Sequence, residues 1–246
     1  MTRSVTRMGI QDAEHYTPEQ RAAIIASYPE HERQARIEGL PAMGEGAVFA
    51  GVNLEDLFVD DFPIPRDWVQ IGGLDFGWDH PSAATKLAWD RDADVVYVTR
   101  EWAARQTTPG VAAIALKPWG EWLPWAWPHD GLQHDKGSGQ GLADQYRETG
   151  LALLHEHATH EAGGFGLEAG ILEMVERMLS GRWLVFRSCV GWMGEARTYH
   201  RKNGQIVKLV DDRISSSRIG LMMLRFARTK PSSDGPRKRG LKGVVV

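Results

Sequence analysis

The sequence predicts an α/β protein with a mixed β-sheet flanked by helices, and three observations support this fold class. Strand-like runs follow one another at residues 68–75, 83–89 and 94–101, as in consecutive antiparallel strands. Beyond residue 109, helix-like and strand-like segments alternate, and strands followed by such alternation indicate a mixed sheet. The 246 residues are 42% hydrophobic and 25% charged, a composition that provides a sizeable core.

The N-terminal segment 1–47 is polar and helix-prone. Thr17-Pro18-Glu19 has the pattern of an N-cap, a proline at the first helical position and an acidic first turn. A second helical stretch is predicted over 29–38 and stops at Gly39. Both have few apolar residues, so we expect a helical linker or lid that packs against a main domain over 48–228.

The main domain is predicted element by element from local patterns. Trp68–Asp75 is typical of a strand that runs into a glycine-relieved loop, and the polar turn 90–94 joins the next two strands as a hairpin. The later elements are a helix over 109–117, a strand over 125–128, a helix over 138–149, a strand over 151–155, a helix over 167–179, a strand over 183–186 and a helix over 212–228.

The C-terminal segment 229–246 is predicted to be a basic, disordered tail. From Arg228 to Lys242 there are six basic residues and one acidic residue, with Pro, Ser and Gly between them. Such a segment cannot form a core, and its charge suits nonspecific contact with DNA phosphates. A merely solvated chain end is an equally good interpretation.

Overall composition excludes several classes of protein. The net charge of -3 argues against a protein that simply coats nucleic acid, but not against a carboxylate-lined site that divalent metal would neutralise. The single cysteine, Cys189, excludes an internal disulfide and a cysteine-based zinc cage. The sequence has no apolar run long enough for a membrane span and no N-terminal signal core, so we expect a cytoplasmic protein without a membrane partner.

Aspartates stand at the ends of predicted elements. Asp75 ends the first strand, Asp130 follows the strand at 125–128, and Asp212 begins the last helix with Asp211 beside it. Two-metal phosphodiester hydrolysis needs several carboxylates on one spot, and in an α/β sheet that spot lies at the strand ends. Each aspartate also has a purely structural interpretation as a turn or cap residue. Three at element ends of one chain favour a metal site.

Three blocks of sequence resemble the nuclease domain of tailed-phage terminase large subunits, in the P22- and Sf6-like branch. They are Gly73-Leu-Asp-Phe-Gly-Trp-Asp-His-Pro81, Ala126-Trp-Pro-His-Asp-Gly131 and Lys208-Leu-Val-Asp-Asp-Arg-Ile-Ser-Ser-Ser-Arg218. The resemblance implies an RNase H-like fold and two Mg²⁺ or Mn²⁺ ions. By the same resemblance Asp75 bridges both ions, Asp130 binds one, Asp212 binds the other or orients water, and Asp211 is an accessory ligand. Ser215-Ser216 and Ile219 depart from the family pattern, which leaves no carboxylate role at position 215.

The resemblance also implies a function and partners. A terminase nuclease cuts concatemeric viral duplex DNA in the bacterial host, together with a small terminase subunit, a portal protein and an ATPase. The sequence has no G-x-x-x-x-G-K-[ST] phosphate loop, and Gly137–Gly141 is better interpreted as a flexible loop. We therefore expect the ATPase module to be absent from this chain, as in an excised domain or a fragmentary prophage gene product.

Further residues near these blocks are candidates for supporting roles. Asp79, His80 and His129 either orient ligands or water beside the metals or hold local turns. Candidates for phosphate contacts, which equally suit an ordinary charged surface, are Arg197, Arg201, Lys202, Lys208 and Arg218. The histidines at 155–160 lack the H-E-x-x-H spacing of a zinc helix.

Two other functions remain open from the sequence. A catalytically idle module that docks DNA or the portal is one, because of the departures near Ser215. A different RNase H-like enzyme, such as a resolvase or integrase, is the other. Divalent-metal binding separates the first from a nuclease, and a preference for branched or terminal DNA separates the second.

Overall fold

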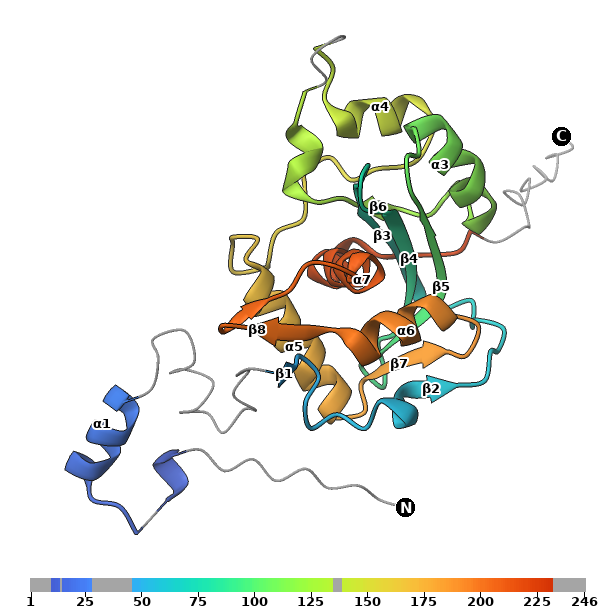
Figure 1. The fold of residues 1–246 in the computed structure, drawn as a ribbon. Coiled ribbons are helices and arrows are strands. Elements are labelled where there is room, and N and C mark those ends of the chain that lie inside the picture. Colours follow the sequence, from blue (N-terminus) through green and yellow to red (C-terminus); the bar gives the residue numbers. More distant parts are fainter. Residues whose placement is uncertain (1–9, 14, 28–45, 135–138, 232–246) are drawn as a thin grey trace, which may run out of the picture.

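A seven-stranded mixed sheet forms the centre of the computed structural model, which describes residues 10–13, 15–27, 46–134 and 139–231 (Figure 1). The strand order is β10-β3-β4-β5-β7-β2, with β6 paired to β3. Its strands are β2 (Phe58–Val59), β3 (Val69–Asp75), β4 (Ser82–Asp90), β5 (Val95–Ala104), β6 (Trp125–Ala126), β7 (Trp183–Phe186) and β10 (Arg228–Thr229). A small second sheet has the order β1-β8-β9, from β1 (Gly46–Ala47), β8 (His200–Lys202) and β9 (Gln205–Ile206).

The helices are short. The α-helices described are α1 (Pro18–Ser27), α3 (Pro109–Leu116), α4 (Leu142–Glu148), α5 (Leu167–Leu179), α6 (Val190–Thr198) and α7 (Asp212–Met222). Single 3₁₀ turns are η1 (Ile10–Asp12), η2 (Leu54–Leu57), η3 (Lys117–Trp119), η4 (His129–Leu132) and η5 (Leu224–Phe226). In the part of the chain with described coordinates, no helix combines the length and apolarity that crossing a bilayer requires.

Strand direction brings the ends of five strands to one edge of the sheet. β3, β4 and β5 form the predicted antiparallel meander. β7 runs parallel to β5, β2 runs parallel to β7, and β6 runs parallel to β3. The carboxyl ends of β2, β3, β5, β6 and β7 therefore share one edge, and loops that leave this edge can place side chains side by side.

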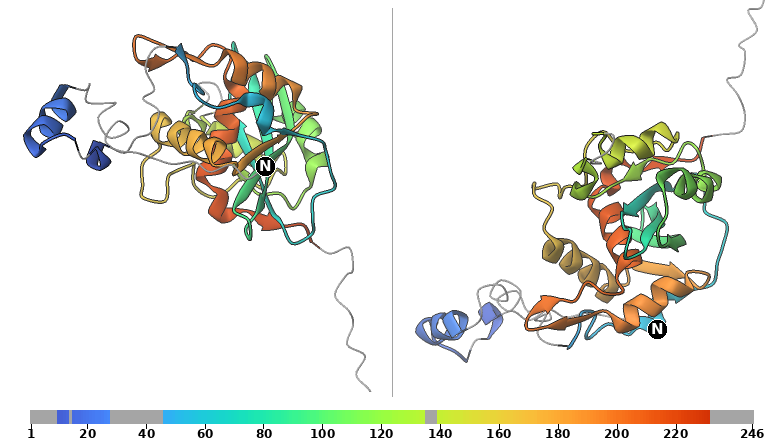
Figure 2. Two further views of the ribbon diagram at one scale, coloured as in Figure 1. Left: turned by 90° about the horizontal axis from the view of Figure 1, so that it is seen from below. Right: turned by 45° about the horizontal axis from the view of Figure 1, so that its top comes forward.

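Alternation along β3 divides the helices between the two faces of the sheet. Ile71 belongs to the core cluster on the face covered by α7, whereas Leu74 belongs to the cluster with α3 and α4. Asp75 has the parity of Ile71, so it faces α7. Figure 1 shows α3 and α4 on one side of the strands and α7 on the other, and Figure 2 shows α5 and α6 on the side of α7. α5 and α6 both contact α7.

A glycine allows α7 to lie directly on β3. A Cβ atom at Gly73 would be 2.0 Å from the backbone oxygen of Ser216 and 2.8 Å from the backbone nitrogen of Gly220. No side chain fits between backbones at such distances. The middle of α7 is thereby held against the strand that ends at Asp75.

Most predicted elements are confirmed, and three predictions need correction. Residues 151–155 do not form a strand, because the segment makes only an isolated bridge between Leu153 and Trp125. The last helix ends at Met222 instead of Arg228, since the chain turns through η5 so that β10 can pair with β3. The helix predicted from Ser138 begins at Leu142. The helix predicted over 29–38 and most of the tail predicted over 229–246 lie outside the described residues.

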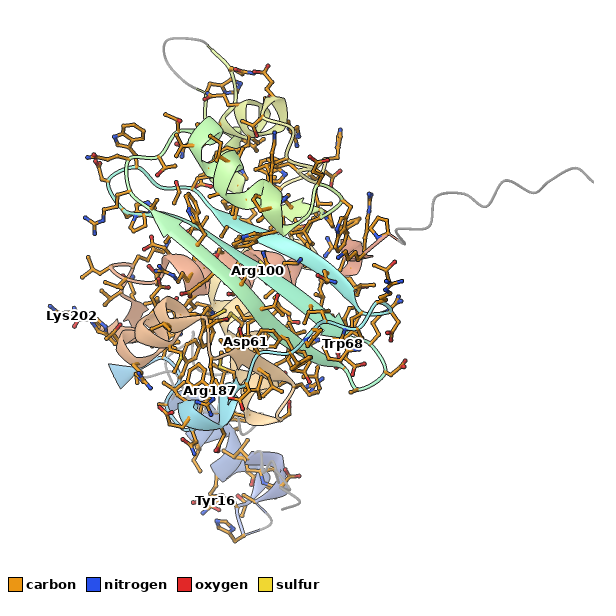
Figure 3. All side chains as sticks on the ribbon, turned by 90° about the vertical axis from the view of Figure 1, so that its right-hand side faces the viewer. Tyr16, Asp61, Trp68, Arg100, Arg187 and Lys202 are labelled. Carbon is orange, nitrogen blue, oxygen red and sulfur yellow. The ribbon has the colours of Figure 1, made fainter. Side chains whose placement is uncertain are left out.

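The sheet contains one buried lysine whose charge has a measurable consequence. Burial, and then repulsion from Arg100 and Lys230, lowers the pKa of Lys86 to about 8. Its Nζ donates to the Trp119 backbone oxygen at 2.9 Å, and Arg100 lies on the neighbouring strand β5 (Figure 3). Above pH 8 the unfolded chain holds the proton that folded Lys86 releases. Stability therefore rises with pH between about 8 and the unfolded-state pKa of about 10.4.

We expect the contribution of Lys86 to the free energy of unfolding to rise by about 2 kcal/mol between pH 7 and pH 9.5. Urea denaturation at several pH values measures this change. The rise attributable to Lys86 is the difference between the wild type and Lys86→Met, which has no proton to release. Equal pH profiles for both proteins would contradict the assignment.

Candidate metal centre

Four carboxylates from three elements line one cavity of about 580 Å³. Asp75 is the last residue of β3, and Asp130 lies in η4, four residues beyond the end of the parallel strand β6. Asp211 is the N-cap residue of α7 and Asp212 is its first residue. The parallel pairing of β3 with β6 and the contact of α7 with β3 explain why acids distant in sequence meet at this edge.

The carboxylates carry more negative charge than their surroundings neutralise. Burial raises the pKa of Asp75 well above its usual range, and repulsion from Asp130 adds to this, while Arg218 opposes it. Burial and repulsion from Asp212 raise the pKa of Asp211 to about 6. The pKa of Asp130 is raised by burial. Such shifts are expected where like charges converge away from water, and a cation bound among them would remove the cost.

One buried cation, Arg218, lies among these acids. It is 8% exposed on α7, and its attraction to Asp75 partly offsets the burial that lowers its own pKa. Its side chain packs on α5 at Gly170, where a Cβ atom would be 2.7 Å from Arg218 Cγ. Arg218 and Lys208, the two lysine or arginine side chains that line the cavity, do not balance four carboxylates, so the cavity has an excess of acidic groups.

Histidines from two elements border the carboxylates. His80 Nδ1 lies 3.0 Å from Asp212 Oδ1 and 3.2 Å from the backbone oxygen of Pro81, so His80 links the β3–β4 turn to the start of α7. His129 stacks on Phe165, with ring centroids 4.7 Å apart and an interplanar angle of 10°. Both histidines line the cavity, whereas Asp79 lines only a neighbouring one.

The donor set suits a hard divalent cation. Asp130 Oδ1 is buried and has no hydrogen-bond partner among the described residues, as expected of an oxygen that would be a ligand of a metal ion. Among the same residues, no three His, Cys, Asp or Glu side chains are arranged to hold one ion between them. Mg²⁺ is usually bound by only one or two carboxylates together with water and substrate phosphate, so two ligands per ion suffice.

The five predicted phosphate contacts fall into different environments. Lys208 and Arg218 line the cavity. Lys202 lies exposed on β8 at the edge of the molecule (Figure 3). Arg197 is half exposed and pairs with Glu55 at 2.7 Å. Arg201 requires correction: its side chain is 2% exposed and forms an ion pair with Glu168, so it is a structural cation that joins β8 to α5.

Sequence reasoning missed the residues that fix the start of α7. Glu195 on α6, 2% exposed, accepts hydrogen bonds from the backbone N–H groups of Arg213 and Ile214 at 2.7 and 3.1 Å. Arg213 Nη1 donates to the same carboxylate at 2.8 Å. Glu101 in turn accepts from the N–H groups of Gly191 and Trp192 at the start of α6. These contacts join residues far apart in sequence, so no local pattern reveals them.

Comparison with known proteins gives one consistent family. The model of the terminase RNase H-like domain family matches residues 72–224. The chain is 46% identical over 245 residues to the large terminase subunit of Salmonella phage P22, covering 99% of this chain and 49% of that protein. It therefore spans about half the length of that relative.

Solved structures agree with this match. The nuclease domain of the P22 large terminase is 44% identical, with a TM-score of 0.71 over 76% of this chain and 96% of that chain. The large-terminase nuclease domain of bacteriophage SPP1, solved with bound Mn, shares the fold at 16% identity and a TM-score of 0.51, covering 70% of this chain and 98% of that one. The chain belongs to the terminase RNase H-like domain family.

Proposed function

We propose that this chain is the nuclease domain of a phage DNA-packaging terminase and that it hydrolyses DNA with divalent cations held by Asp75, Asp130 and Asp212. The observation that supports this most is the shared cavity of four carboxylates with uncompensated charge. Asp211, whose pKa is also raised, is the accessory ligand. When bound, Mg²⁺ or Mn²⁺ would lower the pKa of water and stabilise charge on the entering and leaving oxygens.

The chain's own residues position these ligands. Asp75 interacts electrostatically with both Asp130 and Asp212, and its strand β3 pairs with β6 and contacts α7. We therefore assign it the role of a ligand shared by both ions, of which Asp130 and Asp212 would each complete one. His80 fixes the orientation of Asp212 by its 3.0 Å contact. Arg218, buried beside Asp75, is suited to attract a DNA phosphate into the cavity.

Two ions, each with one or two carboxylate ligands, match this donor set better than one all-protein cage. The SPP1 nuclease domain, which has the same fold, was solved with Mn. We therefore propose Mg²⁺ or Mn²⁺ as the cofactor and a stoichiometry of two ions per site.

The substrate and partners follow from the family. We propose that the substrate is concatemeric duplex DNA in the cytoplasm of the host cell. The P22 relative is about twice as long as this chain, so an ATPase module, a small terminase subunit and a portal are proposed partners of the whole protein. Lys208 in the wall of the cavity and Lys202 outside it, both exposed, are the proposed phosphate contacts, and Arg197 is available if its pair with Glu55 opens.

Plasmid cleavage tests the proposal. Supercoiled DNA incubated with the chain and Mn²⁺ or Mg²⁺ should be converted to nicked and linear forms, and EDTA should stop the reaction. A panel of linear duplex and four-way junction DNA distinguishes this activity from a resolvase, which would cut the junction preferentially. If the chain shows no cleavage and calorimetry detects no binding of divalent ions, the remaining function is that of an idle docking module.

Divalent ions should also stabilise the fold. Binding relieves repulsion among buried acids, and an ion at about 100 times its dissociation constant adds about 2.7 kcal/mol. We expect Mn²⁺ to raise the melting temperature by roughly 5–10 °C, from about 2–4 °C per kcal/mol for a chain of this size. Scanning calorimetry with and without EDTA measures the shift. Asp130→Asn should lose most of it, and an unchanged shift in that variant would remove Asp130 from the ligand set.

A further inference from the structure

A second cavity, of about 620 Å³, adjoins the carboxylate cavity. The two have Phe76, His80 and Asp130 in common in their walls. The other walls come from the β3–β4 turn, from the start of α3, and from η4 with α4. Since β3, β5 and β6 all end here, the cavity lies at the same edge of the sheet as the acids. It is placed to hold a part of the substrate next to the bond that is cut.

The wall formed by the β3–β4 turn presents an exposed aromatic ring. Trp78 is 58% exposed, and among the described residues its ring contacts no other aromatic ring. Two further aromatics line the cavity: Phe76 and Tyr146, whose rings are 4.8 Å apart. An indole face in water beside a cavity is suited to stacking on a flat partner, and every nucleobase has such a face.

Besides the carboxylates of Asp79 and Asp130, the cavity has neutral polar groups. Gln133 and Gln145 line it and carry amides that can pair with the edge of a base. Gln133 is exposed, and its side-chain amide makes no hydrogen bond with any of the described residues. The wall formed by Thr107, Thr108 and Pro109 is the N-terminus of α3, whose dipole favours a phosphate. Aromatic, amide and helix-terminal groups together match one nucleotide better than an apolar peptide.

We propose that this cavity is a nucleobase subsite, in which a base of the strand being cut stacks on Trp78 while its phosphate lies at the carboxylates. The inference rests on the proposed nuclease function, because that function supplies the strand. A base within duplex DNA is stacked and paired, so it must leave the helix to enter the cavity. The chain should therefore bind frayed or single-stranded DNA more tightly than an intact duplex of equal length.

The test compares single strands with and without bases. Fluorescence anisotropy in EDTA measures the affinity of the whole chain for a labelled oligothymidylate and for the same backbone with abasic residues. Stacking of one base on one aromatic ring corresponds to a difference in affinity of roughly tenfold between the two probes. We expect the wild type to prefer the oligothymidylate by about that factor, and Trp78→Ala to bind the two probes with nearly equal affinity. Gln133→Ala should lose a smaller part of the preference.

A matched control is Phe226→Ala, which removes an aromatic that is 45% exposed in η5, away from the cavity. It should keep the full preference. A tenfold preference that persists in Trp78→Ala, or a wild type without any preference, would overturn the subsite. Because no metal is present, the result is independent of catalysis. A wild type that cleaves plasmid with Mn²⁺ but shows no preference between the probes would overturn the subsite alone, and a wild type that shows the preference but no cleavage would overturn the nuclease proposal.

Discussion

Asp75→Asn should reduce metal-dependent DNA cleavage by about a thousandfold or more while making the metal-free protein more stable. The loss of activity follows from the position of Asp75, at which one carboxylate serves both proposed ions, and removal of a single transition-state stabiliser already costs about 100–1,000-fold. Plasmid nicking under single-turnover conditions, with rates compared at several Mn²⁺ concentrations, measures this effect.

The gain in stability of metal-free Asp75→Asn follows from the removal of a buried negative charge. Burial raises the pKa of Asp75 in the folded state, so its ionised form lowers stability as pH rises from the unfolded pKa through the folded one. Asparagine carries no charge, and we expect a gain of about 1–2 kcal/mol near pH 7.5 in EDTA, as at other strained functional sites. The gain should shrink as the pH falls toward about 3, below the unfolded-state pKa of about 3.9, where the wild-type carboxyl is protonated in both states.

Asp92→Asn is the matched control for this pair of effects. Asp92 lies exposed in the β4–β5 turn, which leaves the opposite edge of the sheet. Its removal should change neither cleavage nor melting temperature. If Asp75→Asn were destabilised, or if it cut DNA at the wild-type rate, Asp75 would not be the uncompensated metal ligand that the cavity indicates.

The predictability of each element depends on whether its cause is local. The strands β3 and β7 and the helix α5 were predictable because the alternation or the apolar face lies within the element itself. The run 151–155 is as apolar as β7, yet it makes only one bridge, since a strand also needs a free partner edge. α6 contains two glycines of low helix propensity, and its N-terminus is capped by Glu101 from β5.

The site shows the same division. The sequence placed Asp75, Asp130 and Asp212 at element ends, and the fold brings them to one cavity. The burial of Arg201 was not predictable, because it depends on Glu168 of a different element. The adjoining cavity with Trp78 arises from three separate loops, and none of them carries a signal of it alone.

The start of α7 depends on a relay of two glutamates, the buried Glu195 and the partly exposed Glu101. Glu101 of β5 accepts hydrogen bonds from the first N–H groups of α6, and Glu195 of α6 does the same for α7. Arg213 lies between them, 2.8 Å from Glu195 and 3.3 Å from Glu101. A carboxylate at a helix N-terminus is favoured by the helix dipole and satisfies N–H groups that have no partner within the helix. The relay thereby connects the sheet to the helix that carries Asp212.

Glu195→Ala should destabilise the protein by about 3–5 kcal/mol, because it leaves Arg213 and two backbone N–H groups without their carboxylate. Urea denaturation measures the loss. Burial raises the pKa of Glu195, because the charged carboxylate loses hydration in the folded protein. Glu195→Gln removes this desolvation cost and keeps an acceptor oxygen, so it should lower the free energy of unfolding by only about 1 kcal/mol.

At a temperature where both variants remain folded, Glu195→Ala should also need more Mn²⁺ for half-maximal cleavage, because Asp212 is the first residue of the helix that Glu195 caps. Equal stability of the two variants would show that the acceptor oxygen kept by glutamine contributes nothing, and it would contradict the capping role of Glu195.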